Sequence, residues 1–339
     1  MEKYIKNSTS ELKMNKEVEL IKRSESQRSG IHSYQFSSLE TWTEFSGWQV
    51  AKRQIEPGVL DARFFTATSP QTQLHHMQFN RRLHQQGLPS KDHLHIGIPY
   101  HQGRLRWHRS NISAGCLVSH NAKEGFEVVS DSGLKNFLVS INRTLVEDLS
   151  SVLELDFDFE ELASSNTVYN LNADVATSFL QNLQRFYQAV SGSPDPPLFS
   201  ALEDLQSNLP ILVLETLTKA ETNKYKPEKS AHIRNKGLER ALAYINQNPQ
   251  DAITVQEICK AASVNWRTLE RAFRDQFDVT PKTYLKAVRL NGARKELLAA
   301  DRTEKVANIA NSWGFWHLSQ FAADYRKMFG EIPRASLKR

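Results

Sequence analysis

Short apolar runs separated by turn residues fill residues 31–150, as in "ARFFTAT", "LHHMQF" and "KNFLVSI". Gly, Pro, Asn and Ser stand between the runs, and many short strands with such turn signals are typical of a β-sandwich or barrel. Further along, apolar side chains recur every three or four positions, for example at Val175, Phe179 and Leu183, which predicts helices. The chain is therefore predicted to be α+β, with a β-rich first half and a helical second half.

The last third of the chain contains an internal repeat. Five positions return 52 residues later: Leu269, Phe273, Phe277, Pro281 and Leu285 correspond to Phe321, Tyr325, Phe329, Pro333 and Leu337. Upstream the offset is 51: Ile258, Ser263 and Val264 correspond to Ile309, Gly314 and Phe315. The second copy therefore holds one extra residue in its turn. Each copy predicts a helix-turn-helix, whose second helix can enter the major groove of DNA.

Gly314 stands where the first helix of the second copy must stop and reverse. A left-handed residue commonly ends such a helix, and glycine takes that conformation without steric cost. Ser263 occupies the same place in the first copy, where the conformation carries a cost. Val264 and Phe315 are expected to hold the two helices of each copy together.

Arginines line one face of the second helix in the first copy, residues 266–277. Arg267, Arg271 and Arg274 are spaced i, i+4 and i+7, so they share a face opposite the apolar positions. On an isolated helix such a face is usually only solvated. On the second helix of a helix-turn-helix it favours contact with DNA.

The corresponding helix of the second copy, residues 318–329, is less basic. Its predicted outward positions are Gln320, Ala323 and Lys327, and Arg326 adjoins Lys327. Backbone contact is predicted for Arg326 and Lys327, because phosphate contacts fix register without reading bases. Between the copies, residues 281–300 predict a helix about 27 Å long, at ~1.5 Å per residue. That length approaches the ~34 Å of one DNA turn.

Charge divides the chain in the same way. The whole chain of 339 residues has a formal net charge of +5. Residues 228–339 hold 20 Lys or Arg and 12 Asp or Glu, a net charge of +8. Residues 1–227 hold 23 basic and 26 acidic residues, a net charge of −3. This asymmetry predicts that the last third binds a polyanion and that the rest has another task.

Composition argues against several other classes. The two cysteines, Cys116 and Cys259, are far apart, so no disulfide framework is expected and a cytoplasmic location is predicted. Residues 1–30 are polar and charged, without the apolar region of a signal peptide, and are predicted to be a flexible arm. No run approaches the ~20 apolar residues of a membrane span, so no membrane partner is expected.

The motifs "RTLERAF" and "IANSWGFWHLSQFAADYRKMFGEIP", the second with its Gly-Phe pair and terminal F-G-x-x-P, resemble the DNA-binding domain of AraC/XylS-type transcription regulators. The chain departs from the family pattern at Ser263 and at Asp278, where glycine is frequent. The resemblance implies sequence-specific promoter binding by an effector-responsive activator. Carried over by position, the base readers are Arg267, Thr268 and Arg271 in the first copy and Leu318, Ser319 and Gln320 in the second. Arg274, Ala323, Arg326 and Lys327 complete the predicted DNA-contacting set.

The same resemblance implies the organisation of the whole chain. A cupin-like β-barrel sensor is expected over residues 31–150, a helical dimerisation segment over 151–220 and the DNA-binding domain over 231–339. The charged residues 221–230 are predicted to be a linker. The first half also resembles the sensor halves of ethanolamine-utilisation regulators, a likeness that names no ligand. The expected partners are double-stranded DNA, RNA polymerase, a small-molecule effector and a second copy of the chain.

A small-molecule site in the first half is expected to use aromatic and polar side chains, each of which also suits an ordinary strand position: Phe64, His76, Phe79, Arg104, Arg106 and Trp107. His93 and His95 follow Gly87 with the G-x5-H-x-H spacing of metal-binding cupins and would share one strand face. The carboxylate and the later histidine of such a site do not follow in register. No metal or other cofactor is therefore predicted, and the two histidines are expected to face solvent.

Three functions are compatible with these features. The leading one is a sequence-specific transcription regulator that is not an enzyme. A cupin-type metalloenzyme fused to a DNA-binding domain is the alternative, and bound metal would favour it. A non-specific architectural DNA binder is the third, and it would show no preference for one promoter over random duplex.

Overall fold

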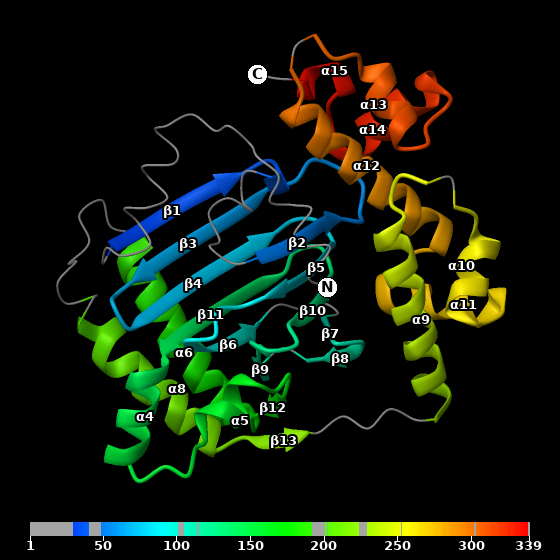
Figure 1. Cartoon of the computed structure of the whole chain (residues 1–339). Coiled ribbons are helices and arrows are strands. Elements are labelled where there is room, and N and C mark those ends of the chain that lie inside the picture. The colour runs from blue at the N-terminus through cyan, green and yellow to red at the C-terminus, as the bar shows by residue number, and fades with distance from the viewer. Residues whose placement is uncertain are drawn as a thin grey trace.

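The computed structural model describes residues 30–40, 49–100, 105–113, 115–191, 201, 203–223, 229–251, 253–301 and 303–337. Nearly all of the predicted arm over residues 1–30, and Arg104, lie outside these residues. Figure 1 shows a β-rich half with helices along one side, and a separate group of helices from the last third of the chain at another side.

Two antiparallel sheets form the first half. Their strands are β1 (Gly30–Phe36), β2 (Gln49–Gln54), β3 (Ala62–Thr68), β4 (Thr72–Phe79), β5 (Leu83–Leu88), β6 (His93–Pro99), β7 (Leu105–Trp107), β8 (Ser110–Ile112), β9 (Leu117–Ser119), β10 (Phe126–Ser130), β11 (Lys135–Asn142), β12 (Val168–Asn170) and β13 (Glu221–Asn223). The larger sheet has the order β1-β3-β4-β11-β6-β9-β12-β13 and the smaller one β2-β5-β10-β7-β8. The predicted β-rich half is confirmed. Within the described residues the strands form two separate sheets and not a closed barrel.

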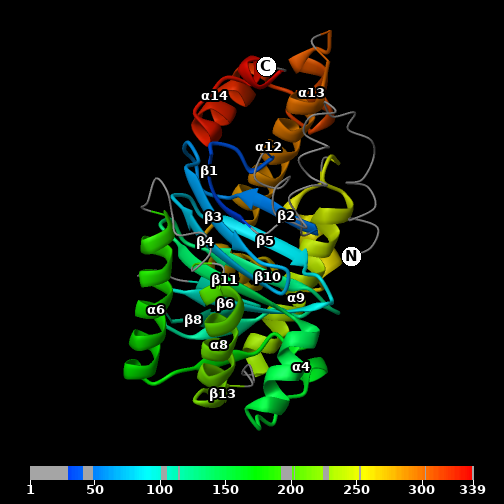
Figure 2. The same ribbon diagram turned by 90° about the vertical axis from the view of Figure 1, so that its left-hand side faces the viewer.

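Helices cover the outer face of the larger sheet (Figure 2). They are α4 (Arg143–Val152), α5 (Phe159–Ala163), α6 (Ala173–Ser191), the π-helical η1 (Asp204–Asn208) and α8 (Leu209–Thr218). Ile96 and Phe137 of the sheet pack in one core with Phe179 and Leu214 of the helices. A second core lies between the two sheets and includes Phe64 and Phe126. The larger sheet is thus buried on both faces.

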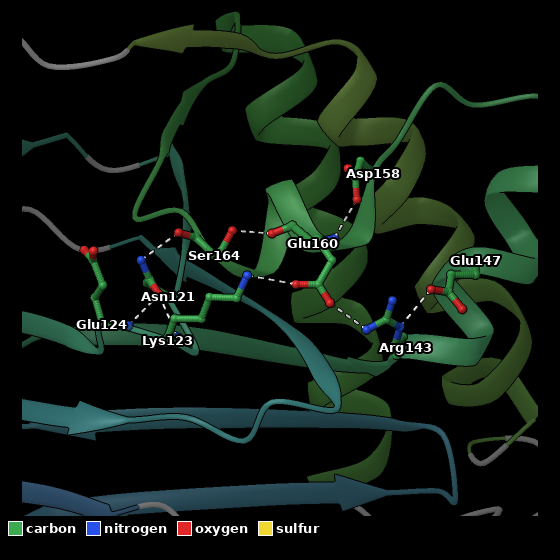
Figure 3. A network of polar contacts seen from close by, with 8 residues as sticks. All are labelled: Asn121, Lys123, Glu124, Arg143, Glu147, Asp158, Glu160 and Ser164. Atoms are coloured by element: carbon green, nitrogen blue, oxygen red, sulfur yellow. Dashed lines mark hydrogen bonds and ion pairs between the residues drawn. The ribbon is translucent and has the colours of Figure 1, made fainter. Parts of the chain in front are cut away.

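A surface network of ion pairs and hydrogen bonds fastens α5 to its surroundings (Figure 3). Glu160 of α5 pairs with Lys123 at 3.0 Å and with Arg143 of α4 at 2.6 Å, and Arg143 also reaches Glu147. The Asn121 side chain donates to the Ser164 carbonyl at 2.7 Å, just after α5. Because the charged members are exposed, this network orders the surface more than it stabilises the fold.

The two ends of the predicted linker, residues 221–230, belong to regular elements. Glu221–Asn223 is β13, which pairs with β12 and so belongs to the larger sheet, and α9 begins at Lys229. Residues 224–228, the middle of the predicted linker, lie outside the described residues. The sequence misled here because ladder hydrogen bonds are made by the backbone, which charged side chains do not prevent from pairing.

The last third is helical, as predicted. Its helices are α9 (Lys229–Gln247), α10 (Val255–Ala262), α11 (Trp266–Phe277), α12 (Pro281–Ala299), α13 (Val306–Ser312), α14 (Leu318–Phe329) and α15 (Pro333–Ser336). Figure 1 shows α12 running between the pair α10 and α11 and the pair α13 and α14. Phe273, Tyr284 and Tyr325 are fully buried in one core that joins both pairs. Ile55, directly after β2, and Val129 of β10 belong to the same core, so the two halves share an interface.

Two smaller findings bear on the class of protein. Cys116 and Cys259 are both free, and burial raises the pKa of the Cys116 thiol to about 11. Among the helices in the described ranges, none combines the length and the apolar composition that crossing a membrane requires.

Candidate nucleic-acid interface

The two helix pairs have the same turn, made by equivalent hydrogen bonds. In the first unit, α10 and α11, Val264 N donates to Cys259 O at 3.1 Å. In the second unit, α13 and α14, Phe315 N donates to Ala310 O at 2.9 Å, 51 residues later. The left-handed turn residues also match: Ser263 has φ 54° and Gly314 has φ 75°. The predicted repeat, and the reason for Gly314, are confirmed.

Side-chain packing fixes the turn in each unit by different means. A Cβ added to Gly237 of α9 would lie 2.7 Å from Val264 Cγ1, so glycine lets α9 approach the first turn closely. In the second turn Phe315 packs against Phe321, with ring centroids 4.9 Å apart. Val264 and Phe315 are both partly buried against the core, as their predicted role requires.

The second helix of the first unit begins at an N-cap. Asn265 accepts a hydrogen bond from Thr268 N at 2.9 Å, which satisfies one of the free N–H groups of the first turn. Leu269, Phe273 and Phe277 are fully buried, which fixes the rotation of α11.

The predicted arginine face is exposed. Arg267, Arg271 and Arg274 all reach solvent, and Thr268 is half-buried. Arg271 Nε lies 3.8 Å from Asp275, a weak exposed pair that a phosphate or base edge can replace. A second helix that binds in a DNA groove needs exposed cationic side chains, and α11 presents them.

The second helix of the second unit presents a mixed polar face. Leu318, Ser319 and Gln320 are exposed in its first turn. Further along α14, the exposed members of the predicted set are Ala323, Arg326 and Lys327. All the predicted DNA-contacting positions thus lie outside the core.

The aromatic cluster around Gly314 divides into two roles. Trp313 packs against Gly292 of α12, and its indole N–H donates to Glu296 Oε2 at 2.6 Å. Trp316 is 68% exposed. The sequence-based prediction omitted Trp266, which is 45% exposed at the first position of α11. The 52-residue offset could have found it, because it pairs Trp266 with the predicted base reader Leu318.

The first half contacts the carboxyl ends of both second helices through Arg82, directly before β5, and Gln54 of β2. At the end of α11, Arg82 pairs with Asp278 at 3.3 Å and with Asp131 at 3.1 Å. At the end of α14, Gln54 Nε2 donates to Met328 O at 2.9 Å. Unpaired carbonyls at a helix C-terminus attract such donors and cations. The first half therefore holds both second helices at the ends opposite their exposed first turns.

A buried polar network completes this interface. His84 Nδ1 lies 2.8 Å from Tyr284 Oη in α12, and His84 Nε2 lies 3.0 Å from Glu127 Oε1. Burial lowers the pKa of His84 despite the neighbouring carboxylate. Burial alone would raise the pKa of Glu127, but its hydrogen bond with His84 and the nearby charge of Arg109 lower it. The arrangement is a neutral imidazole that donates to an ionised carboxylate and accepts from the tyrosine.

The predicted small-molecule residues are divided among three faces. Phe64, Phe79 and Trp107 belong to the core between the sheets. His76 lies on the other side of the larger sheet, where its ring is 4.3 Å from that of Tyr187. Arg106 lies 3.8 Å from Asp131 on the face of the smaller sheet that meets the last third. A pocket lined by His76, Arg106 and the other three together is therefore wrong, because neighbouring strand residues point to opposite faces.

The predicted solvent exposure of the two strand histidines is also wrong. His95 is 2% exposed, with Nδ1 2.8 Å from Ser140 Oγ and Nε2 3.2 Å from Ser90 Oγ. His93 is half-buried, and its ring stacks with that of His95 at 5.9 Å. The smaller sheet covers the face that the sequence left to solvent. In the part of the chain that the structure describes, no three or more His, Cys, Asp or Glu side chains gather as a metal site would require.

Known proteins resemble the last third of this chain. A family model described as a helix-turn-helix domain matches residues 258–339. The probable thc operon regulatory protein of Rhodococcus erythropolis is 36% identical over 99 residues, which are 29% of this chain and 30% of that protein. The XylDLEGF operon transcriptional activator of Pseudomonas putida is 30% identical over 105 residues, 31% of this chain and 33% of its own length. The chain thus matches about a third of the length of these curated relatives.

Some solved structures overlap most of the chain and others only its last third. The AraC-like transcriptional activator CuxR covers 79% of this chain and 96% of its own, with 15% sequence identity and a TM-score of 0.40. A probable AraC family regulator from Rhodopseudomonas palustris covers 30% of this chain and 94% of its own at 32% identity, with a TM-score of 0.29. These scores are too low to assign the fold of the first half.

Proposed function

We propose that this chain, whose last third is a helix-turn-helix domain of the AraC/XylS type, is a transcription activator that reads two adjacent major-groove segments of a promoter. The observation that carries the proposal is the pair of equivalent units with exposed second helices, joined by α12. The 19 residues of α12 span about 28 Å at ~1.5 Å per residue, which approaches one turn of DNA, ~34 Å.

The first unit has the chemistry of base reading. Arginine recognises guanine through the O6 and N7 acceptors of the major groove, so Arg267 and Arg271 are assigned to base edges. Thr268 belongs to the same reading turn, and Arg274 extends the cationic face along α11. In the second unit Ser319 and Gln320 are assigned to base edges. Arg326 and Lys327 contact phosphates and so position α14, and Ala323 lies on the same outward face.

The first half is proposed to be a cupin-like sensor whose effector binds between the two sheets. Buried polar atoms normally have hydrogen-bond partners. Among the described residues, Thr66 Oγ1, His75 Nδ1 and Trp107 Nε1 are buried without one. Val50 of β2 faces the core between the two sheets, and Lys52, two residues further along the strand, faces the same side. Burial lowers the pKa of Lys52 to about 7. These groups favour a polar effector that accepts hydrogen bonds.

The interface between the halves supplies a route from effector to DNA. Gln54 is on the same strand as Lys52, and it reaches both α14 and the side chain of Asn291 in α12. A shift of β2 would therefore move the second unit relative to the first. Dimerisation through the helices of residues 151–220 and contact with RNA polymerase belong to the same proposal.

Selection of bound fragments from a random duplex pool with the full-length protein, followed by footprinting, tests the function. We expect an enriched site with two protected major-groove segments about one helical turn apart. Enrichment of no sequence would instead identify a non-specific architectural binder. Failure to bind any duplex, with or without a panel of metabolites, would refute the proposal.

A further inference from the structure

Three of the large hydrophobic side chains that are exposed in the described residues lie at the starts of the two second helices. Trp266 begins α11 and is 45% exposed, and Leu318 begins α14 and is 44% exposed. They are 52 residues apart, which is the offset of the repeat. Trp316, in the second turn, is the third. A single exposed hydrophobic residue is ordinary, but the same helix position in both units calls for a common explanation.

Trp266 does not serve the fold in the way that the other aromatic residues of these units do. Trp313 has its hydrogen bond to Glu296, and Phe315 has its ring contact with Phe321. Within the described ranges, the Trp266 indole makes no hydrogen bond and no aromatic contact. A partner outside the chain would remove its exposed surface, and that of Leu318, from water.

The surroundings of the two side chains select the partner. Trp266 is followed by Arg267 and Thr268, and Leu318 by Ser319 and Gln320, all of them polar and all in the first turn of a second helix. A membrane or an apolar protein groove would have to desolvate these neighbours. The major groove of DNA accepts them through base edges, and it offers one apolar group, the C5-methyl of thymine.

We propose that Trp266 and Leu318 each pack on the methyl group of a thymine, one in each half of the operator. The inference rests on the proposed function, and it adds that both units read a thymine at equivalent positions. The two thymines should lie about one turn of DNA apart, since α12 sets the separation of the units. A methyl contact also gives sequence preference to the second unit, whose face is less basic.

Replacing individual thymines of the selected operator by deoxyuridine tests the inference, because uracil keeps the base pair and removes only the methyl group. Binding of the full-length protein is measured by fluorescence anisotropy at fixed salt. We expect one thymine in each half-site at which uracil weakens binding about fourfold, the worth of one buried methyl group. Trp266→Ala should abolish the effect at the first half-site only, and Leu318→Ala at the second only.

The matched control is Val152→Ala, which removes an exposed apolar side chain from α4 and should leave both uracil effects intact. Tight operator binding by the wild type without any difference between thymine and uracil would overturn the inference and leave the proposed function standing. Equal weakening of specific and random duplex by Trp266→Ala would make Trp266 a backbone contact and overturn it too. A Trp266→Ala protein that keeps the first uracil effect but changes its oligomeric state in sedimentation would assign the side chain to a protein interface. Selection of no sequence would refute the proposed function itself.

Discussion

The first and second helix-turn-helix units reach the same backbone by opposite choices of side chain. The first unit has strong N-caps: Thr254 and Glu257 form a capping box on α10, and Asn265 caps α11. In the second unit the N-cap residues are Lys305 of α13 and His317 of α14, and neither makes a side-chain capping hydrogen bond. Capping side chains are typically worth about 1 kcal/mol each. The first unit is thus the better stabilised at the beginnings of its helices.

At the C-terminal ends of the helices the second unit is the better stabilised. The left-handed positions are Ser263 and Asp278 in the first unit, and Gly314 and Gly330 in the second. A residue with a Cβ is strained there by roughly 1 kcal/mol or more. Asp278 compensates through its ion pair with Arg82 of the first half. The two units therefore share one hydrogen-bond geometry, and each stabilises it with the side chains that its own surroundings supply.

Gly330→Ala should break the second unit more severely than any change at the equivalent position of the first. The alanine would have to adopt a left-handed backbone conformation, and its Cβ would collide with Val59 Cγ2. We expect a loss of about 2–3 kcal/mol in the free energy of unfolding by urea, from the strain and the overpacking together. Adding Val59→Ala should recover the steric part. Asp278→Ala should cost less, because that position already holds a non-glycine residue, and an equal cost would contradict this account.

Arg271→Ala should distinguish the units by their contact with DNA. We expect a loss of ~1–3 kcal/mol at the specific operator and a relaxed preference at one base pair of the first half-site. Lys327→Ala removes a proposed phosphate contact of the second unit and should weaken specific and random duplex alike. Gel shifts at fixed salt measure both, because phosphate contacts change steeply with ionic strength.

A saturation scan of the operator provides the complementary measurement. Base-pair changes under the first unit should cost ~1–3 kcal/mol each, and those under the second clearly less. Equal sensitivity in both half-sites would make Ser319 and Gln320 primary readers.

Acid should weaken the interface between the two halves, where the buried His84 contacts Tyr284 of α12 and Phe277 of α11. Burial lowers the pKa of His84 below its usual 6.5, so below pH 6.5 the unfolded chain binds a proton that the folded chain refuses. His84 therefore contributes a fall in stability of at most about 1 kcal/mol between pH 6.5 and 5.5, and other buried histidines whose pKa burial lowers, such as His75 and His120, add to it. Glu127, whose pKa is lowered, adds a further loss only below about pH 4.5.

Urea unfolding of the wild type and of His84→Gln across this pH range measures the effect. The amide of glutamine can still bridge Glu127 and Tyr284 but does not titrate, so the slope between pH 6.5 and 5.5 should become shallower. An unchanged slope would assign the pH dependence to the other buried histidines.

Exchange of the turn residues gives the smallest expected effect. Ser263→Gly should stabilise the protein by about 0.5–1 kcal/mol, and Gly314→Ser should destabilise it by a similar amount. The nearest atom to a Cβ at Gly314 is Arg289 Cζ at 3.6 Å, so the backbone and not a clash sets that cost. Thermal unfolding of the two variants and of the double exchange measures the changes. A double variant far from the sum would show that the turns are coupled through the shared core.

The helix-turn-helix units were predictable from the sequence because their contacts are local. The offsets of 52 and 51 residues predicted equivalent turns, and the hydrogen bonds at Val264 and Phe315 are equivalent. The face that carries Arg271 followed from helical periodicity alone. Trp266 was not predicted because it carries no charge, although the same offset makes it equivalent to Leu318.

The sheets were far less predictable. Alternation on β6 correctly placed His93 and His95 on one face of the strand, but it could not say which side would be covered. Both faces of the larger sheet are buried, so the usual link between a polar residue and solvent fails. The same ambiguity allowed His76 and Arg106 to be assigned to a pocket that neither side chain faces.

The sequence by itself determined the number of units, the position of their turns, the basic face of α11 and the change from strands to helices. Each of these depends on residues within about one helix of each other, where periodicity and backbone preference act directly. Only the tertiary structure decided the pairing of the strands, the burial of His95 and the attachment of Gln54 and Arg82 to the ends of the second helices. Those contacts join residues more than 40 positions apart, and no local pattern encodes which of the many possible long-range pairings buries the most apolar surface.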